Sequence, residues 1–382
     1  MASYAEIYAY FLESTRLRDL VSTAAEVAIV TGFTLRVDPY WAMRYDAEVL
    51  GLDPDEWRAK LLRGLGDWRW EETYAAWWTA VSTSGYLRRD LWHGHRWDER
   101  GPILLTVCYR PGATPAVFGA EDDVDFPRQL ARLAAIVNGS GANARLEERQ
   151  PARLVRHADP IVAGSEAGVI GGTLRSESGG LFGVTCAHVA KTNDEVVCSR
   201  GSFRGTCTAH TPLVTAPPGR PLDPAALAPP YPKPGNGPEI NMLDAALVSL
   251  PGGTRSRSPC LVASDLSEGL RVVVTRERRT EHCRLGSLCL SYSMHSRGER
   301  YCFQETIEVV PEPRFPLAGR LGRMFSFPPR RGDSGGWVIT EENEPRWAGL
   351  LFAADDRRGF AVRASWVHQW AEAQLGERLA VF

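Results

Sequence analysis

The chain has 382 residues, with 44 basic and 46 acidic side chains and a formal net charge of −2 at neutral pH. This balance gives no general attraction to nucleic acid or to an anionic membrane, so neither is expected as a partner. Hydrophobic residues form 44% of the chain and charged residues 24%, which is typical of globular proteins, and the length exceeds what one hydrophobic core usually supports. We therefore expect a multidomain protein with units at 1–150 and 155–382.

The first unit, 1–150, is expected to be a small α+β domain. Apolar residues at helical spacing predict a helix over 4–20, and Asp53-Pro54-Asp55-Glu56 combines an N-cap with a capping box. Strands are expected over 28–37 and 102–109. Eight of the 12 tryptophans precede residue 100. This aromatic density indicates either a surface that binds a regulatory protein or the packed core of the domain.

The second unit is expected to be all-β with a C-terminal helix. A helix over 365–382 is predicted from tryptophans and leucines at helical spacing, with Ser365 as its N-cap. The proline-rich stretch 212–238 suits a surface insertion, or alternatively a ligand for a partner domain. Short apolar runs punctuated by glycine and proline predict strands over 169–174, 181–185, 245–250, 270–275, 287–290, 306–310, 337–340, 349–353 and 360–362.

Three motifs in this unit combine into a candidate site for nucleophilic catalysis. His188 follows Thr185-Cys186-Ala187, Asp244 precedes a predicted strand, and Ser334 lies within a run of glycines, Gly332-Asp333-Ser334-Gly335-Gly336. A serine hydroxyl is a poor nucleophile at neutral pH until an imidazole accepts its proton, and a buried carboxylate orients that imidazole. The glycines allow a sharp turn whose backbone N–H groups, those of Gly332 and Ser334, form an oxyanion hole.

These motifs resemble those of the chymotrypsin-like (trypsin-like) serine peptidases. The order His188, Asp244, Ser334 and the wide spacing are also those of the family, and 349–354 resembles the strand that lines its substrate cleft. The resemblance covers roughly 155–382. It implies two six-stranded antiparallel barrels with the triad between them and a C-terminal helix.

The resemblance says less about the substrate. It implies that Pro328, six residues before Ser334, lies at the base of the specificity pocket, where trypsin-type enzymes have an aspartate. Asp355 and Asp356 either supply an acidic wall of the pocket or form a turn. The main chain of Phe352, Ala353 and Ala354 is expected to pair with an extended peptide, because this pairing needs only an exposed strand edge.

Cysteine usage indicates a reducing compartment. The eight cysteines show no CxxC pair, and Val189 occupies the place where many secreted relatives have a disulfide-forming cysteine. With no signal-peptide pattern at the N-terminus, we expect a cytoplasmic protein. The pairs Cys207 with His210 and His282 with Cys283 have no second pair at ligand spacing, so no metal or other cofactor is expected.

Ile161-Val162-Ala163-Gly164 resembles the N-terminus that trypsin-type zymogens form on cleavage, but it lies too close to His188 for the strands normally found between them. Because no convincing activation site exists, we expect a serine endopeptidase that its N-terminal domain or a partner restrains. By analogy alone, such an enzyme suits a bacterial antiviral defence system. The alternative hypothesis is an inactive module that binds peptides or acts as a scaffold.

Overall fold

The computed structural model describes residues 3–38, 101–112, 125–150, 152–154, 161–163, 166–198, 204–216, 240–251, 259–275, 280–296, 298–311 and 333–382. The expected helix after Asp53, the tryptophans before residue 100, most of the proline-rich insertion, Pro328 and Gly332 lie outside these residues.

Six antiparallel strands of the C-terminal half form a closed barrel. Neighbours in the barrel follow the order β13-β16-β17-β18-β15-β14, and β13 pairs back onto β14. The strands are β13 (Arg271–Thr275), β14 (Thr280–Ser296), β15 (Glu299–Pro311), β16 (Trp337–Thr340), β17 (Arg346–Ala354) and β18 (Gly359–Arg363). The apolar runs expected over 287–290 and 306–310 belong to one long β14–β15 hairpin, whose residues are buried along most of their length.

A second antiparallel sheet contains the strands between residues 161 and 249 and the last strand of the chain. Its order is β19-β7-β8-β11-β10-β9-β5-β6. The strands are β5 (Ile161–Ala163), β6 (Glu166–Gly168), β7 (Gly172–Ser176), β8 (Leu181–Thr185), β9 (Glu195–Cys198), β10 (Arg204–His210), β11 (Ala246–Ser249) and β19 (Leu379–Val381). Ile161 is paired here with both β6 and β9. The expected all-β architecture is confirmed.

The C-terminal helix is shorter than expected. α8 (Ala364–Leu375) begins before Ser365, and its N-cap Arg363 makes no side-chain capping bond. It ends because Gly376 adopts a left-handed conformation with φ +67°, a conformation that favours glycine. The chain then turns back, and β19 pairs with β7. The helix expected over 365–382 was therefore wrong at its end.

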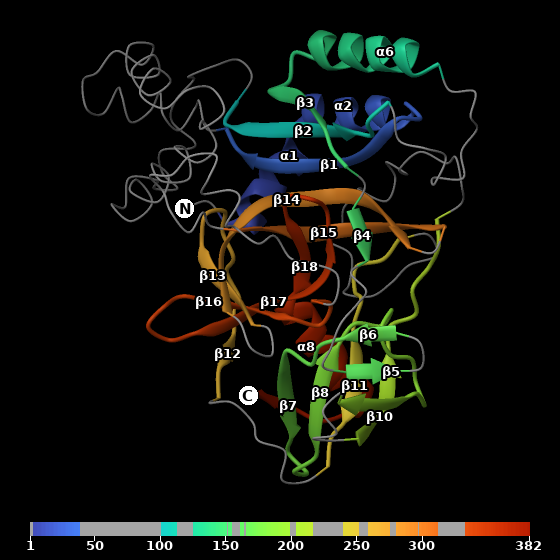
Figure 1. Ribbon diagram of the computed structural model, residues 1–382. Coiled ribbons are helices and arrows are strands. Elements are labelled where there is room, and N and C mark those ends of the chain that lie inside the picture. Colours follow the sequence, from blue (N-terminus) through green and yellow to red (C-terminus); the bar gives the residue numbers. More distant parts are fainter. Residues whose placement is uncertain are drawn as a thin grey trace, which may run out of the picture.

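The N-terminal elements stack on the barrel at one end of the molecule (Figure 1). They are α1 (Tyr4–Glu13), α2 (Thr15–Ala25), β1 (Val30–Val37), β2 (Ile103–Tyr109), α6 (Phe126–Gly139) and β3 (Ala144–Glu148). The single helix expected over 4–20 is two helices, because the Ser14 side chain accepts from the N–H of Leu17 and starts α2. The two predicted strands are present as β1 and β2.

The N-terminal elements and the barrel share a sheet and a core. β1 pairs antiparallel with β14, from Gly32 opposite Tyr292 to Leu35 opposite Leu288. Ile7 and Phe11 of α1 belong to the same buried cluster as Val272 and Leu285 of the barrel. Because burial of apolar side chains drives folding, the described N-terminal elements stabilise the barrel directly.

Two short strands complete the barrel sheet. β12 (Leu261–Val262) pairs parallel with β17. β4 (Ala152–Leu154) lies between β14 and β17 and pairs with both. β4 thus connects the N-terminal elements to the barrel through main-chain pairing.

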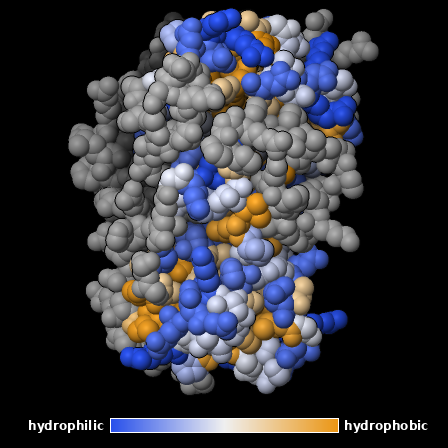
Figure 2. Space-filling model, turned by 90° about the vertical axis from the view of Figure 1, so that its right-hand side faces the viewer, coloured by the Kyte–Doolittle hydropathy of each residue, from blue (hydrophilic) through white to orange (hydrophobic). Residues whose placement is uncertain are grey.

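The surface of the described residues has few apolar projections. On the face shown in Figure 2, hydrophilic and hydrophobic residues are interspersed. The exposed large hydrophobic residues among those described are Val162, Leu261 and Val310, on three different strands. None of the helices in the described ranges is long and apolar enough to cross a membrane.

Candidate active site

The three predicted catalytic side chains form one hydrogen-bonded chain. His188 Nδ1 lies 2.6 Å from Asp244 Oδ2, and His188 Nε2 lies 2.9 Å from Ser334 Oγ. Both distances are those of ordinary or charge-assisted hydrogen bonds. The geometry therefore brings together the three residues that the sequence motifs had suggested.

Pairing between two strands brings His188 and Asp244 together. His188 lies in the turn after β8, and Asp244 comes just before β11. β8 and β11 pair antiparallel, with Thr185 opposite Ala246, so the end of one strand meets the start of the other. The second oxygen of Asp244 accepts the backbone N–H of His188 at 3.1 Å. Asp244 is fully buried, and these two hydrogen bonds hold the imidazole in one orientation.

The turn that carries Ser334 requires glycine at the next position. Gly335 has φ +94°, and a Cβ there would lie 1.9 Å from the carbonyl oxygen of Val169. Its N–H donates to the carbonyl of Leu351 at 2.8 Å, while Ser334 O accepts from Val169 N–H at the same distance. The backbone of Ser334 and Gly335 is thus fixed between β17 and the segment before β7.

Ser334 Oγ also contacts the predicted substrate strand. It lies 3.1 Å from the carbonyl oxygen of Phe352, to which it can donate. A hydroxyl has a single proton, so this carbonyl and His188 Nε2 compete for it. Ser334 is fully buried and the His188 side chain is 2% exposed, so both groups are largely shielded from solvent in this structure.

Cys186 is a fourth buried polar side chain at the site. Its Sγ, His188 and Asp244 offer ligand atoms within 4.8 Å of one another. Burial raises the pKa of the Cys186 thiol well above its usual value, and nearby Asp244 raises it further. The protonated thiol donates to the carbonyl of Leu351 at 3.3 Å. A metal ion would require the thiolate and would compete with the hydrogen bonds of His188, so this donor set fits a triad better than a metal site.

The predicted substrate strand is paired along both edges. Phe352, Ala353 and Ala354 are the last residues of β17. One edge pairs with β18, and on the other edge Ala353 lies opposite Leu154 and Ala354 opposite Arg153 of β4. Phe352 and Ala353 are fully buried. The strand edge that was expected to be exposed is therefore covered, and this expectation was wrong.

The two aspartates after β17 have different surroundings. Asp355 Oδ1 accepts the backbone N–H groups of Arg357 and Arg358, each at 2.7 Å, which closes the turn between β17 and β18. Asp356 lies 3.8 Å from Arg357 at the surface. The Asp355 carboxylate is turned into its own loop, so the turn interpretation fits it better than the acidic pocket wall.

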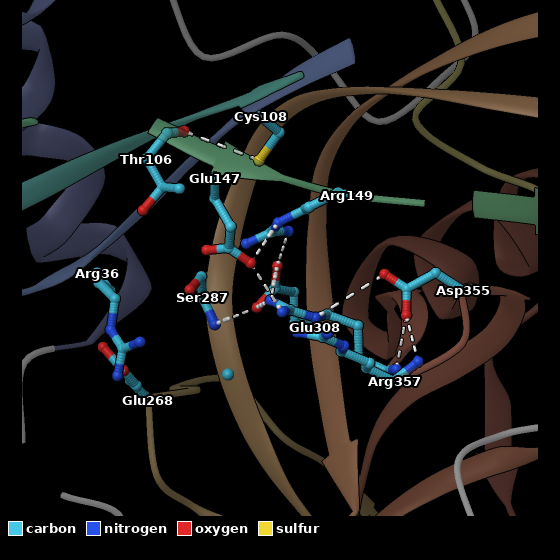
Figure 3. Close-up of polar contacts among 12 residues, drawn as sticks. Arg36, Thr106, Cys108, Glu147, Arg149, Glu268, Ser287, Glu308, Asp355 and Arg357 are labelled. Atoms are coloured by element: carbon cyan, nitrogen blue, oxygen red, sulfur yellow. Dashed lines mark hydrogen bonds and ion pairs between the residues drawn. The ribbon is translucent and has the colours of Figure 1, made fainter. Parts of the chain in front are cut away.

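A buried cluster of charges joins this turn to the N-terminal part of the chain (Figure 3). Arg149 donates to Glu308 of β15 at 2.5 Å and to Glu147 of β3 at 3.0 Å. Arg358, in the β17–β18 turn, donates to the same two glutamates at 3.2 and 3.0 Å. Burial alone would raise the pKa of Glu308, but Arg149 and Arg358 outweigh it and lower this pKa to about 2. We call these four residues the ionic anchor.

The ionic anchor had no signal in the sequence. Its members come from three separate parts of the chain, 147–149, 308 and 358, and single charged residues on strands are ordinary surface features. Only the pairing of β15 with β18 and the position of β3 bring them together.

No family model and no curated protein matches the chain. Solved structures do. Thermobifida fusca protease A is 12% identical, at a TM-score of 0.35 over 60% of this chain and 99% of its own. The Cellulomonas bogoriensis chymotrypsin is 11% identical, at a TM-score of 0.32 over 60% and 98%. The active form of the Rv3671c protease from M. tuberculosis is 16% identical, at a TM-score of 0.31 over 55% and 82%.

The resemblance to chymotrypsin-like serine proteases, expected from the motifs, is thus also found among solved structures. At these identities it concerns the fold only. What the site can do follows from its own geometry, described above.

Proposed function

We propose that this chain is a serine endopeptidase with His188, Asp244 and Ser334 as its catalytic triad. The continuous hydrogen bonding from Asp244 through His188 to Ser334 carries the proposal. Three motifs that lie far apart in the sequence would have no structural need to meet in this order and at these distances. The two antiparallel sheets on either side of the site support the same conclusion.

The geometry supports an acyl-enzyme mechanism. Asp244 accepts a hydrogen bond from the Nδ1–H group of His188, which leaves Nε2 of His188 as the base for Ser334. Ser334 Oγ attacks the peptide carbonyl carbon while its proton moves to Nε2. His188 then protonates the leaving amine, and a water molecule hydrolyses the acyl-enzyme with His188 again as base. The N–H groups of Gly332 and Ser334 would stabilise the oxyanion.

We infer that the substrate is an extended peptide that pairs with Phe352, Ala353 and Ala354, on the edge of β17 that β4 covers in this structure. The cleavage preference is not that of trypsin, since Pro328 stands where trypsin-type enzymes have an acidic residue and Asp355 is engaged in its own turn. This main-chain recognition supports cleavage within unfolded or extended protein segments.

We also propose that the enzyme works in a reducing compartment under the control of its N-terminal region or a partner protein that this region binds. All eight cysteines lie in described residues and none forms a disulfide, which supports a cytoplasmic location. The buried triad and the core shared with α1 support a restrained enzyme. A role as a triggered effector in bacterial antiviral defence remains an analogy with other peptidases of this kind.

Labelling with a fluorophosphonate probe tests the proposal. The probe reacts covalently with an activated serine, so the wild-type chain is expected to label and Ser334→Ala is not. His188→Ala should also lose labelling, because it keeps the hydroxyl but removes the base. Equal labelling of wild type and Ser334→Ala would contradict a catalytic serine. An unlabelled wild type would favour the inactive, peptide-binding alternative.

A further inference from the structure

The strand β4 lies where the proposed substrate would bind. One edge of β17 is used by β16 up to Leu350, and β18 pairs along the opposite edge. Beyond β16, Ala353 and Ala354 pair on that first edge with Leu154 and Arg153 of β4. The next residue back along β17, Phe352, has its carbonyl 3.1 Å from Ser334 Oγ. β4 therefore covers the edge that leads directly to the nucleophile.

β4 also has the direction of a substrate. It is antiparallel to β17, so moving from Arg153 to Leu154 corresponds to moving from Ala354 to Ala353. The chain thus runs toward Phe352 and Ser334. An extended peptide that pairs antiparallel with this edge and approaches the nucleophile would make the same main-chain contacts.

The ionic anchor holds β4 close to this edge. Arg149 is 3% exposed at its side chain, and only Gln150 and Pro151 separate it from β4. Its partner Glu308 is on β15, and Arg358, which binds the same glutamates, is in the turn directly after the substrate strand. β4 further pairs with Met294 and His295 of β14. A strand tethered this closely has an effective concentration at the edge of β17 in the millimolar range or above.

We propose that residues 152–154 are a built-in occupant of the peptide-binding edge and keep the peptidase latent until they are displaced. This inference rests on the proposed peptidase function and gives a physical form to its restraint. The occupant competes with substrate for the same main-chain partners. Displacing it exposes the edge without rebuilding the triad, so latency raises the apparent KM for a peptide and leaves kcat unchanged.

Proline substitution in β4 tests the proposal on the full-length chain. Alternate residues of a strand direct their N–H groups to opposite neighbours, so Arg153→Pro and Leu154→Pro are made separately, each with its alanine variant as the matched control. Proline removes a backbone donor, whereas alanine keeps it. With quenched fluorescent casein as substrate, at least one proline variant is expected to show a KM about tenfold lower at similar kcat. The alanine variants should behave as wild type.

A binding assay separates the occupant from catalysis. A fluorescein-labelled peptide with the sequence of residues 149–157 is added to Ser334→Ala, with and without the effective proline substitution. The peptide is expected to bind only where β4 has been displaced, and its own proline version should not bind. Casein kinetics unchanged by either proline, or no peptide binding to the displaced chain, would overturn the proposal. If no variant cleaves casein yet the peptide binds, the peptidase and its latency fail, while occupancy of the edge stands.

Hydrogen exchange on the unmodified chain covers the case in which the proline variants do not fold. One of the two adjacent amides, Ala353 or Ala354, faces β4 and loses its strand partner when β4 is displaced. We expect slow exchange at both amides. Exchange at one of them as fast as at the exposed residue Asp356 would overturn the proposal.

Discussion

Replacing Gly335 by alanine should disable the site through its backbone. The residue has φ +94°, and the added Cβ would lie 1.9 Å from Val169 O and 2.7 Å from Thr185 Oγ1. The first is a backbone atom of a residue whose N–H donates to the carbonyl of Ser334, so the turn itself must move. A non-glycine residue at such a φ costs roughly 1–3 kcal/mol, and forced overpacking adds about 1–3 kcal/mol.

Gly376→Ala is the matched control. Gly376 also has a positive φ, +67°, at the end of α8, but no atom lies within 4 Å of the added Cβ. We expect a loss of about 1 kcal/mol there, against roughly 2–6 kcal/mol for Gly335→Ala. At about 2–4 °C per kcal/mol, the thermal midpoints should differ by several degrees in circular dichroism.

The functional effects should differ more. A displacement of about 1 Å at Ser334 costs on the order of 100-fold in rate, so fluorophosphonate labelling of Gly335→Ala should slow by at least about that factor. Gly376→Ala should label at the wild-type rate. If both variants melt and label alike, the requirement for glycine at this turn, and with it our account of how the nucleophile is held, is refuted.

Three further outcomes follow from the site and the ionic anchor. Asp244→Asn should lower kcat for casein by about 10⁴-fold, because the imidazole loses its orienting carboxylate. Asp265→Asn, at an exposed residue, should leave kcat unchanged. Similar rates for the two variants would remove Asp244 from the triad. The lowered pKa of Glu308, about 2, means that this group stabilises the fold above pH about 4.5 and loses that contribution as the pH falls toward 2. The loss amounts to roughly 3 kcal/mol and is partly offset by Asp355, whose pKa is raised by burial. Glu308→Gln should therefore be less stable than the wild type at pH 7, and its thermal midpoint should change less between pH 5 and pH 2. Parallel curves of thermal midpoint against pH for the two proteins would contradict this prediction. Finally, iodoacetamide at pH 8 should alkylate the partly exposed Cys260 but not Cys186, because burial raises the pKa of the Cys186 thiol. Peptide mass spectra report both modifications. Early alkylation of Cys186 would disprove this prediction.

The triad could be predicted because its chemistry imposes local sequence. Ser334 needs glycine beside it, and the positive φ of Gly335 shows why the motif is restrictive. The strands β1 and β2 were also predictable, because their apolar runs are long and bounded by turn residues. Where the prediction of the C-terminal helix failed, the signal was present: Gly376 marks its end.

β4 and the ionic anchor could not be predicted in this way. Ala152-Arg153-Leu154 is too short to show a periodic pattern, and it becomes a strand only because β14 and β17 offer it partners on both sides. Arg149 and Arg358 are ordinary arginines until β3 and β15 bring Glu147 and Glu308 to them.

The sequence by itself determined the chemistry that we propose for this protein: the nucleophile, its base, the orienting carboxylate and the tight turn depend on residue types at particular spacings. The tertiary structure alone decided the state in which that chemistry is held. Main-chain pairing and buried charges depend on which segments meet in space, and they place the chain's own β4 on the edge of β17 that we propose binds substrate. The physical reason is that the edge of a strand forms main-chain hydrogen bonds with an extended segment of any sequence. No residue pattern therefore predicts which segment pairs with it.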